Sequence, residues 1–63
     1  MPKTDLKMTA AGFKTTDDLV DATIHLLDEN DYHFLAIALA QELLYHRSDQ
    51  DKVTLIKEYV QLV

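Results

Sequence analysis

The chain has 63 residues, 48% of them hydrophobic, and eleven acidic against six basic residues, for a formal net charge of −5. A chain this short forms at most one domain and buries only about 60% of its unfolded surface, which leaves little room for a deep substrate cleft. The lack of cysteine excludes disulfides and thiolate metal sites, and the acidic balance argues against direct nucleic-acid binding. No apolar run approaches the roughly 18 residues of a membrane span and no signal sequence opens the chain, so we expect a cytoplasmic protein that does not contact a membrane.

Residues 1–14 show no helical periodicity and contain Pro2 and the single glycine, Gly12. Segments of this kind at a chain end are poorly ordered unless something ties them down, so we expect a flexible N-terminal segment. The alternative is that this segment folds back and lays its apolar side chains on the helices or on a partner. The side chains available for such docking are Leu6, Met8 and Phe13.

From residue 15 onward, apolar residues recur at helical spacing and predict a three-helix domain over residues 15–63. The predicted helices run over about 16–29, 32–46 and 49–62. The expected fold class is therefore all-α, a small three-helix domain that we expect to associate into a dimeric helical bundle.

Local signals mark where these helices begin and end. Thr15, followed three residues later by Asp18, resembles a capping box at the start of the first helix. Asn30 tolerates the left-handed position that ends a helix, and Asp31 can cap the next one. Ser48 is a good N-cap for the third helix.

The first helix is predicted to have one buried face and one carboxylate face. Seven carboxylates and no Lys or Arg lie between residues 15 and 46, so this region holds more than the whole net charge. The carboxylate face is either ordinary solvated surface or a docking surface for a basic protein partner. The candidate partner-binding residues are Asp17, Asp18, Asp21, Asp28 and Glu29.

The second helix has no polar side, because its large apolar residues form two stripes. A helix that is apolar all round is normally buried on every side, and two neighbouring helices cannot cover it completely. We therefore expect a second copy of the chain to cover the remainder, because two-fold dimers are the commonest oligomers. The alternatives are a lid made by the N-terminal segment and a different protein. The expected dimer interface consists of Phe34, Ile37, Gln41, Leu44 and Tyr45.

The sequence offers little for catalysis or for binding a metal or cofactor. It has three histidines and one serine, and it lacks a glycine-rich phosphate loop and a nucleophile motif. A single imidazole near carboxylates, as at His25, does not provide a good ligand set for zinc without further ligands. A helix-turn-helix interpretation is disfavoured because Asp49 and Asp51 begin the third helix, where they would repel phosphate. We therefore expect no enzyme activity, no cofactor and no metal.

These observations predict a small acidic regulatory or interaction protein that acts by protein–protein binding, as a homodimer. One alternative is a nucleic-acid mimic, in which the carboxylates of the first helix imitate phosphates and inhibit a DNA-binding enzyme. Another is a structural subunit whose second helix docks into a larger assembly. The sequence carries no motif diagnostic of a protein family.

Overall fold

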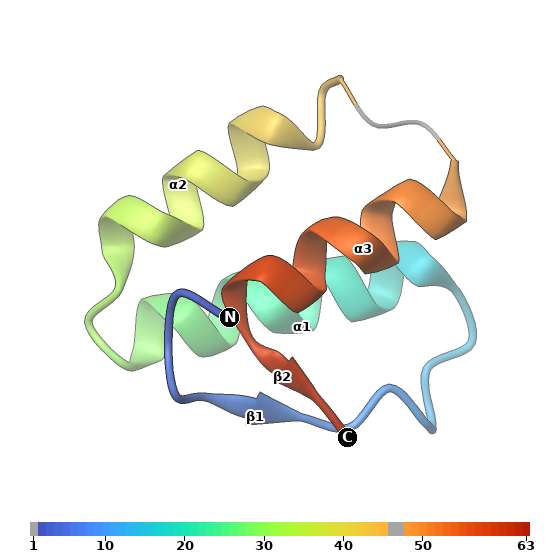
Figure 1. Ribbon diagram of the computed structural model, residues 1–63, viewed down its shortest axis with the longest axis horizontal. Coiled ribbons are helices and arrows are strands. Elements are labelled where there is room, and N and C mark those ends of the chain that lie inside the picture. The colour runs from blue at the N-terminus through green and yellow to red at the C-terminus, as the bar shows by residue number, and fades with distance from the viewer. Residues whose placement is uncertain (1, 46–47) are drawn as a thin grey trace.

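The computed structural model describes residues 2–45 and 48–63. In chain order these residues form β1 (Lys7–Met8), α1 (Thr16–Glu29), α2 (His33–Glu42), α3 (Asp49–Tyr59) and β2 (Gln61–Leu62) (Figure 1). The three helices confirm the expected small helical domain, and the pair of two-residue strands is an addition that the periodicity did not predict. None of the described helices is long and apolar enough to cross a membrane.

Helix α1 has the predicted bounds, and its start is fixed by a side-chain cap. The Thr15 hydroxyl accepts a hydrogen bond of 3.1 Å from the backbone N–H of Asp18. This bond satisfies one of the free N–H groups that every helix start leaves. The N-cap half of the predicted capping box, made by Thr15, is confirmed.

The turn after α1 differs from the prediction at both of its residues. The left-handed position belongs to Asp31, which has φ 65°, whereas Asn30 has φ −103°. The N–H of Tyr32 donates to the carbonyl of Leu27 and that of Asp31 to Asp28, which is the Schellman pattern of helix endings. Because Asp31 occupies this strained position, it does not cap α2: no side-chain hydrogen bond caps that helix, whose N-cap is Tyr32.

Helix α2 is shorter than the predicted 32–46. It ends at Glu42, and residues 43–45 continue as turns in which the N–H groups of Leu44 and Tyr45 donate to carbonyls three residues earlier. These tighter bonds are common where a helix frays at its C-terminal end. The last predicted residue, His46, lies outside the described residues.

Helix α3 begins as predicted but ends three residues before the predicted position 62. The Ser48 hydroxyl accepts a 3.1 Å hydrogen bond from the N–H of Asp51, which confirms its N-cap role. The chain leaves the helix at Val60, which is extended at φ −137° and ψ 163°, and enters β2. Strands β1 and β2 pair in parallel, with Lys7 opposite Gln61. The backbone bonds that would extend α3 are thus replaced by bonds to the N-terminal segment.

The N-terminal segment is docked on the end of α3, so the expectation of a flexible segment is not confirmed. The N–H of Lys3 donates to the Glu58 carbonyl at 2.8 Å, and the buried Thr4 hydroxyl donates to the Tyr59 carbonyl at 2.7 Å. These bonds satisfy carbonyls that the helix end leaves free. Of the predicted docking side chains, Leu6 and Met8 pack against the core, while Phe13 remains 38% exposed.

A single core lies between the three helices. Its fully buried members come from α1, α2, α3 and the residue that follows α3, namely Leu27, Leu39, Ile56, Tyr59 and Val60. The buried Thr23 hydroxyl is satisfied by the carbonyl of Leu19 at 2.8 Å. The predicted buried face of α1 is therefore used, α3 contributes a buried face as well, and α2 contributes only one side to this core.

Candidate interaction surfaces

One side of α2 faces solvent and is apolar. Leu39 is fully buried and Leu35 and Leu43 are half-buried on the inner side, as one of the two predicted stripes requires. The other stripe, which we call the α2 outer face, is exposed along its whole length. The exposed fractions of its apolar members are 88% for Phe34, 56% for Ile37, 74% for Leu44 and 84% for Tyr45, and Gln41 between them is also exposed.

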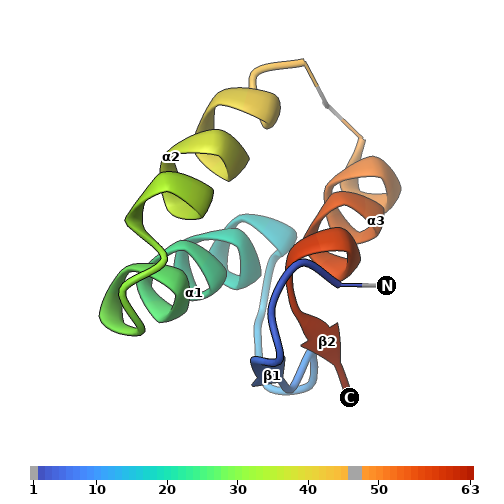
Figure 2. The same cartoon turned by 60° about the vertical axis from the view of Figure 1, so that its left-hand side comes forward.

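The N-terminal segment does not cover the α2 outer face. Both views place β1 and β2 on the far side of the molecule from α2, beside the end of α3 (Figures 1 and 2). Backbone bonds to Glu58, Tyr59 and β2 fix the segment there. Within the described residues the lid considered above is therefore not formed over α2.

A shallow apolar hollow adjoins the α2 outer face and lies between α1 and α2. It has a volume of about 480 Å³, and Ile37 belongs both to its lining and to the α2 outer face. The exposed apolar surface therefore continues beyond the stripe toward α1. The other lining residues are Ile24, His25, Asp28, His33, Ala36 and Ala40.

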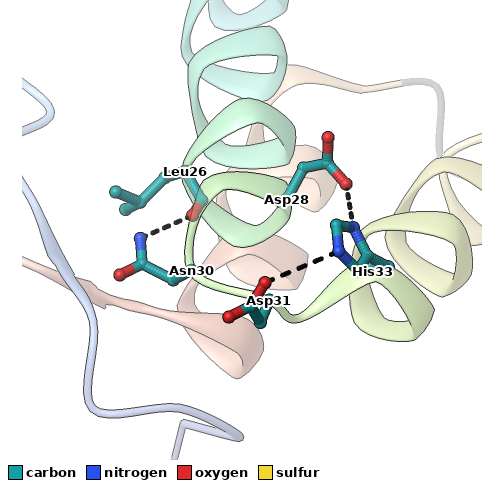
Figure 3. A network of polar contacts seen from close by, with 5 residues as sticks. All are labelled: Leu26, Asp28, Asn30, Asp31 and His33. Carbon is teal, nitrogen blue, oxygen red and sulfur yellow. Dashed lines mark hydrogen bonds and ion pairs between the residues drawn. The ribbon is translucent and has the colours of Figure 1, made fainter.

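A small polar network lies at the turn between α1 and α2 (Figure 3). The His33 ring forms an ion pair through Nδ1 with Asp28, and its Nε2 lies 3.8 Å from Oδ1 of Asp31. The Asn30 amide donates to the Leu26 carbonyl at 2.8 Å. All of these side chains except Leu26 are exposed, and exposed ion pairs of this kind contribute at most about 1 kcal/mol each.

The predicted acidic surface on α1 is exposed, but two of its five carboxylates have partners within the chain. Asp17 accepts a 3.0 Å bond from the Lys52 ammonium of α3, and Asp28 contacts His33. Among the described residues, no ion pair engages the remaining three, Asp18, Asp21 and Glu29. The carboxylates available to a basic partner are therefore these three.

The histidines that the structure describes are exposed and have local partners. His25 Nδ1 lies 2.9 Å from the backbone carbonyl of Asp21, within α1, and His33 is in the turn network. No three His, Asp or Glu side chains of residues 2–45 and 48–63 converge as a metal site requires. The third histidine, His46, lies outside the described residues.

A partly buried contact between α2 and α3 was not predicted from the sequence. The Tyr59 hydroxyl donates to a carboxylate oxygen of Glu42 at 3.1 Å, and the Lys3 ammonium lies 4.5 Å from the centre of the Tyr59 ring. Burial, followed by the hydrogen bond and negative charge of Glu42, raises the pKa of Tyr59 from 10.0 to about 12. No local sequence signal pairs Tyr59 with a residue 17 positions away.

Comparison with protein-family models, with curated proteins and with solved structures finds no match to this chain. The function is therefore inferred from the contacts, exposure and charge of its own residues.

Proposed function

We propose that this protein is a small, non-enzymatic regulatory protein that acts by protein–protein binding and associates as a homodimer through the α2 outer face. The observation that carries the proposal is the row of exposed apolar side chains along α2 and the turns that follow it, from Phe34 at 88% exposed to Tyr45 at 84%. The largest apolar patch on a monomer typically measures about 300–600 Å² and is often a binding site.

The size of the α2 outer face supports a second copy as its partner. Large aromatic side chains have about 150–250 Å² of surface and large aliphatic ones lie near the lower end of that range. At their exposed fractions, the two aromatic and two aliphatic side chains together present roughly 600 Å². Two such surfaces together would remove roughly 1,200 Å² from water, the lower end of the range for specific interfaces. Burying this surface would also add to a core that a 63-residue chain builds from few residues.

The second element of the proposal is a partner with a basic surface, bound by the acidic side of α1. Asp18, Asp21 and Glu29 support it because they are exposed and unengaged by ion pairs in the described structure. Charges of one sign on one face speed the encounter with an oppositely charged surface and orient it.

Sedimentation equilibrium from about 1 to 500 µM protein tests the homodimer. We expect a dimer for the wild type and a monomer for the double variant Phe34→Ser, Leu44→Ser. The matched control is Val63→Ser, which removes a side chain that is 69% exposed but lies outside α2. Circular dichroism of each variant reports whether the helices persist. A wild type that stays monomeric and folded at the highest concentration would overturn the homodimer.

Charge reversal tests the acidic surface in a capture experiment from the source cell, read by mass spectrometry. The variant Asp18→Lys, Asp21→Lys should lose its partner, whereas Asp49→Lys, Asp51→Lys changes the net charge equally at the start of α3 and should keep it. Loss of the partner in both variants would show that net charge alone matters. It would overturn the acidic side of α1 as the binding surface. Release of the captured partner by DNA would favour the nucleic-acid mimic instead.

A further inference from the structure

We propose that the second copy packs its own α2 antiparallel on the α2 outer face, about a two-fold axis that passes near residue 39. In this register Phe34 of one chain lies against Leu44 and Tyr45 of the other, and Ile37 lies against Gln41. The inference rests on the proposed homodimer and adds its direction and register.

The spacing of the exposed residues matches this register. In an antiparallel helix pair, residues whose numbers have a constant sum lie level with each other, and a two-fold interface makes every such contact twice. Ile37 with Gln41 within α2, and Phe34 with Leu44 in the turns that continue it, share the same sum. Tyr45 lies one position further, so one register engages the whole α2 outer face. Ala38 and Ala40 flank the centre, where small side chains let two helices approach closely.

The distribution of charge favours the antiparallel over the parallel direction. A parallel pair would place the two α1–α2 turns side by side, each with the exposed carboxylates of Asp28, Glu29 and Asp31. An antiparallel pair separates these turns, and it sets residues 33–35, at the start of each α2, level with residues 43–45 of the other chain, which carry no charge. It also opposes the dipoles of the two α2 helices, which the parallel pair would align.

Disulfide trapping tests the register, because the chain has no cysteine of its own. The single variants Phe34→Cys and Leu44→Cys are oxidised alone and as a mixture. Antiparallel packing holds two Phe34 positions about 15 Å apart along the helices, at 1.5 Å per residue. A disulfide needs Cα atoms within about 7 Å, so neither variant alone should be trapped. The mixture should give the mixed disulfide.

The rate at which disulfides form by random collision is measured with the pair Asp21→Cys and Lys57→Cys. These positions lie on α1 and α3, outside the α2 outer face. At about 100 µM protein, the mixed 34–44 disulfide should form on the order of tenfold faster than this control, because bound partners hold the two thiols at millimolar effective concentration. Sedimentation of each reduced variant shows that it still dimerises. Isotope-filtered NMR of the wild type, expected to show Phe34 ring protons close to Leu44 methyls across the interface, avoids substitution altogether.

Trapping of Phe34→Cys with itself in a protein that sediments as a dimer would overturn the antiparallel register and leave the homodimer standing. A monomeric wild type would instead overturn the homodimer on which the register rests. A dimer with no trapping above the collision control, and no contact between Phe34 and Leu44 by NMR, would overturn the α2 outer face as the interface.

Discussion

Asp31 holds a backbone conformation that its side chain disfavours. Its φ of 65° lies in the left-handed region, where a Cβ crowds the following carbonyl and where glycine is the usual residue at a helix end. Asp31 also adds a carboxylate at the C-terminal end of α1, beside Asp28, where the helix dipole disfavours negative charge. The backbone conformation and the charge of Asp31 therefore both lower the free energy of unfolding.

Asp31→Gly should raise the free energy of unfolding by about 0.5 to 1 kcal/mol, because glycine adopts positive φ without steric crowding. Asp31→Ala removes the same charge but keeps a Cβ, so it should be less stable than Asp31→Gly by about 1 kcal/mol. Urea denaturation of both variants measures the difference. Equal stability of the two variants would show that charge, not backbone conformation, dominates at this position.

Tyr59 should make the fold sensitive to alkali. Its pKa is raised from 10.0 to about 12 by burial and by Glu42, so the folded state holds this proton at pH values where the unfolded state has lost it. The contribution of Tyr59 to the free energy of unfolding keeps its full value below pH 10. As pH rises from 10 to 12, it falls by about 2 to 3 kcal/mol in all. Urea denaturation at pH 9 and 11.5 measures the loss. Tyr59→Phe, which removes the titrating hydroxyl, should lose less over the same interval, and an equal loss would contradict the assignment.

At the scale of elements, the N-terminal segment acts as the cap of α3. Thr4→Val keeps the shape of a buried side chain but removes the hydroxyl that binds the Tyr59 carbonyl and accepts from the Leu6 N–H. We expect a loss of about 1 to 2 kcal/mol in the free energy of unfolding, measured by urea denaturation. Thr9→Val, at an exposed position two residues past Lys7, is the matched control and should change stability by less than about 0.5 kcal/mol. An unchanged free energy of unfolding in Thr4→Val would contradict the capping role of the N-terminal segment and favour a flexible segment.

The sequence pattern predicts the end of a helix well when the residues that determine it are close in the chain, and poorly when they are far away. The caps at Thr15 and Ser48 act within three residues, so the sequence pattern predicted both helix starts. The end of α3 depends on β1, more than 50 positions earlier in the chain, and helical periodicity carries no trace of that pairing. Residues 60–62 therefore lie outside the helix that the periodicity predicts to include them.

The candidate surfaces divide in the same way. The sequence predicts two apolar stripes on the second helix, and the structure buries the stripe that contains Leu39 and exposes the stripe that contains Phe34. Helical spacing in α1 predicts a carboxylate face, but it does not predict that Lys52, 35 positions later, binds Asp17. Contacts between helices depend on how the helices cross, which a pattern within one helix does not specify.

At the scale of the whole molecule, the two proposed interfaces should respond to salt in opposite directions. Two copies of a chain with net charge −5 repel each other, so raising ionic strength from about 0.02 M to 0.2 M should tighten the homodimer a few-fold by screening. Binding of a basic partner to the acidic side of α1 should weaken over the same range. Sedimentation equilibrium at the two salt concentrations measures the first effect. A homodimer that weakens with salt would contradict an apolar α2 interface.

The parallel pairing of β1 with β2 also determines how the fold carries mechanical load. Pulling at residues 2 and 63 draws the strands in opposite directions along their length, so the bonds from Gln61 to Leu6 and from Val63 to Met8 are strained together. Pulling at residues 14 and 63 draws both strands from the same end and breaks these bonds one at a time. An optical-tweezers comparison of the two attachments should give the higher rupture force for the first, so this small helical domain would owe its tensile strength to its shortest elements.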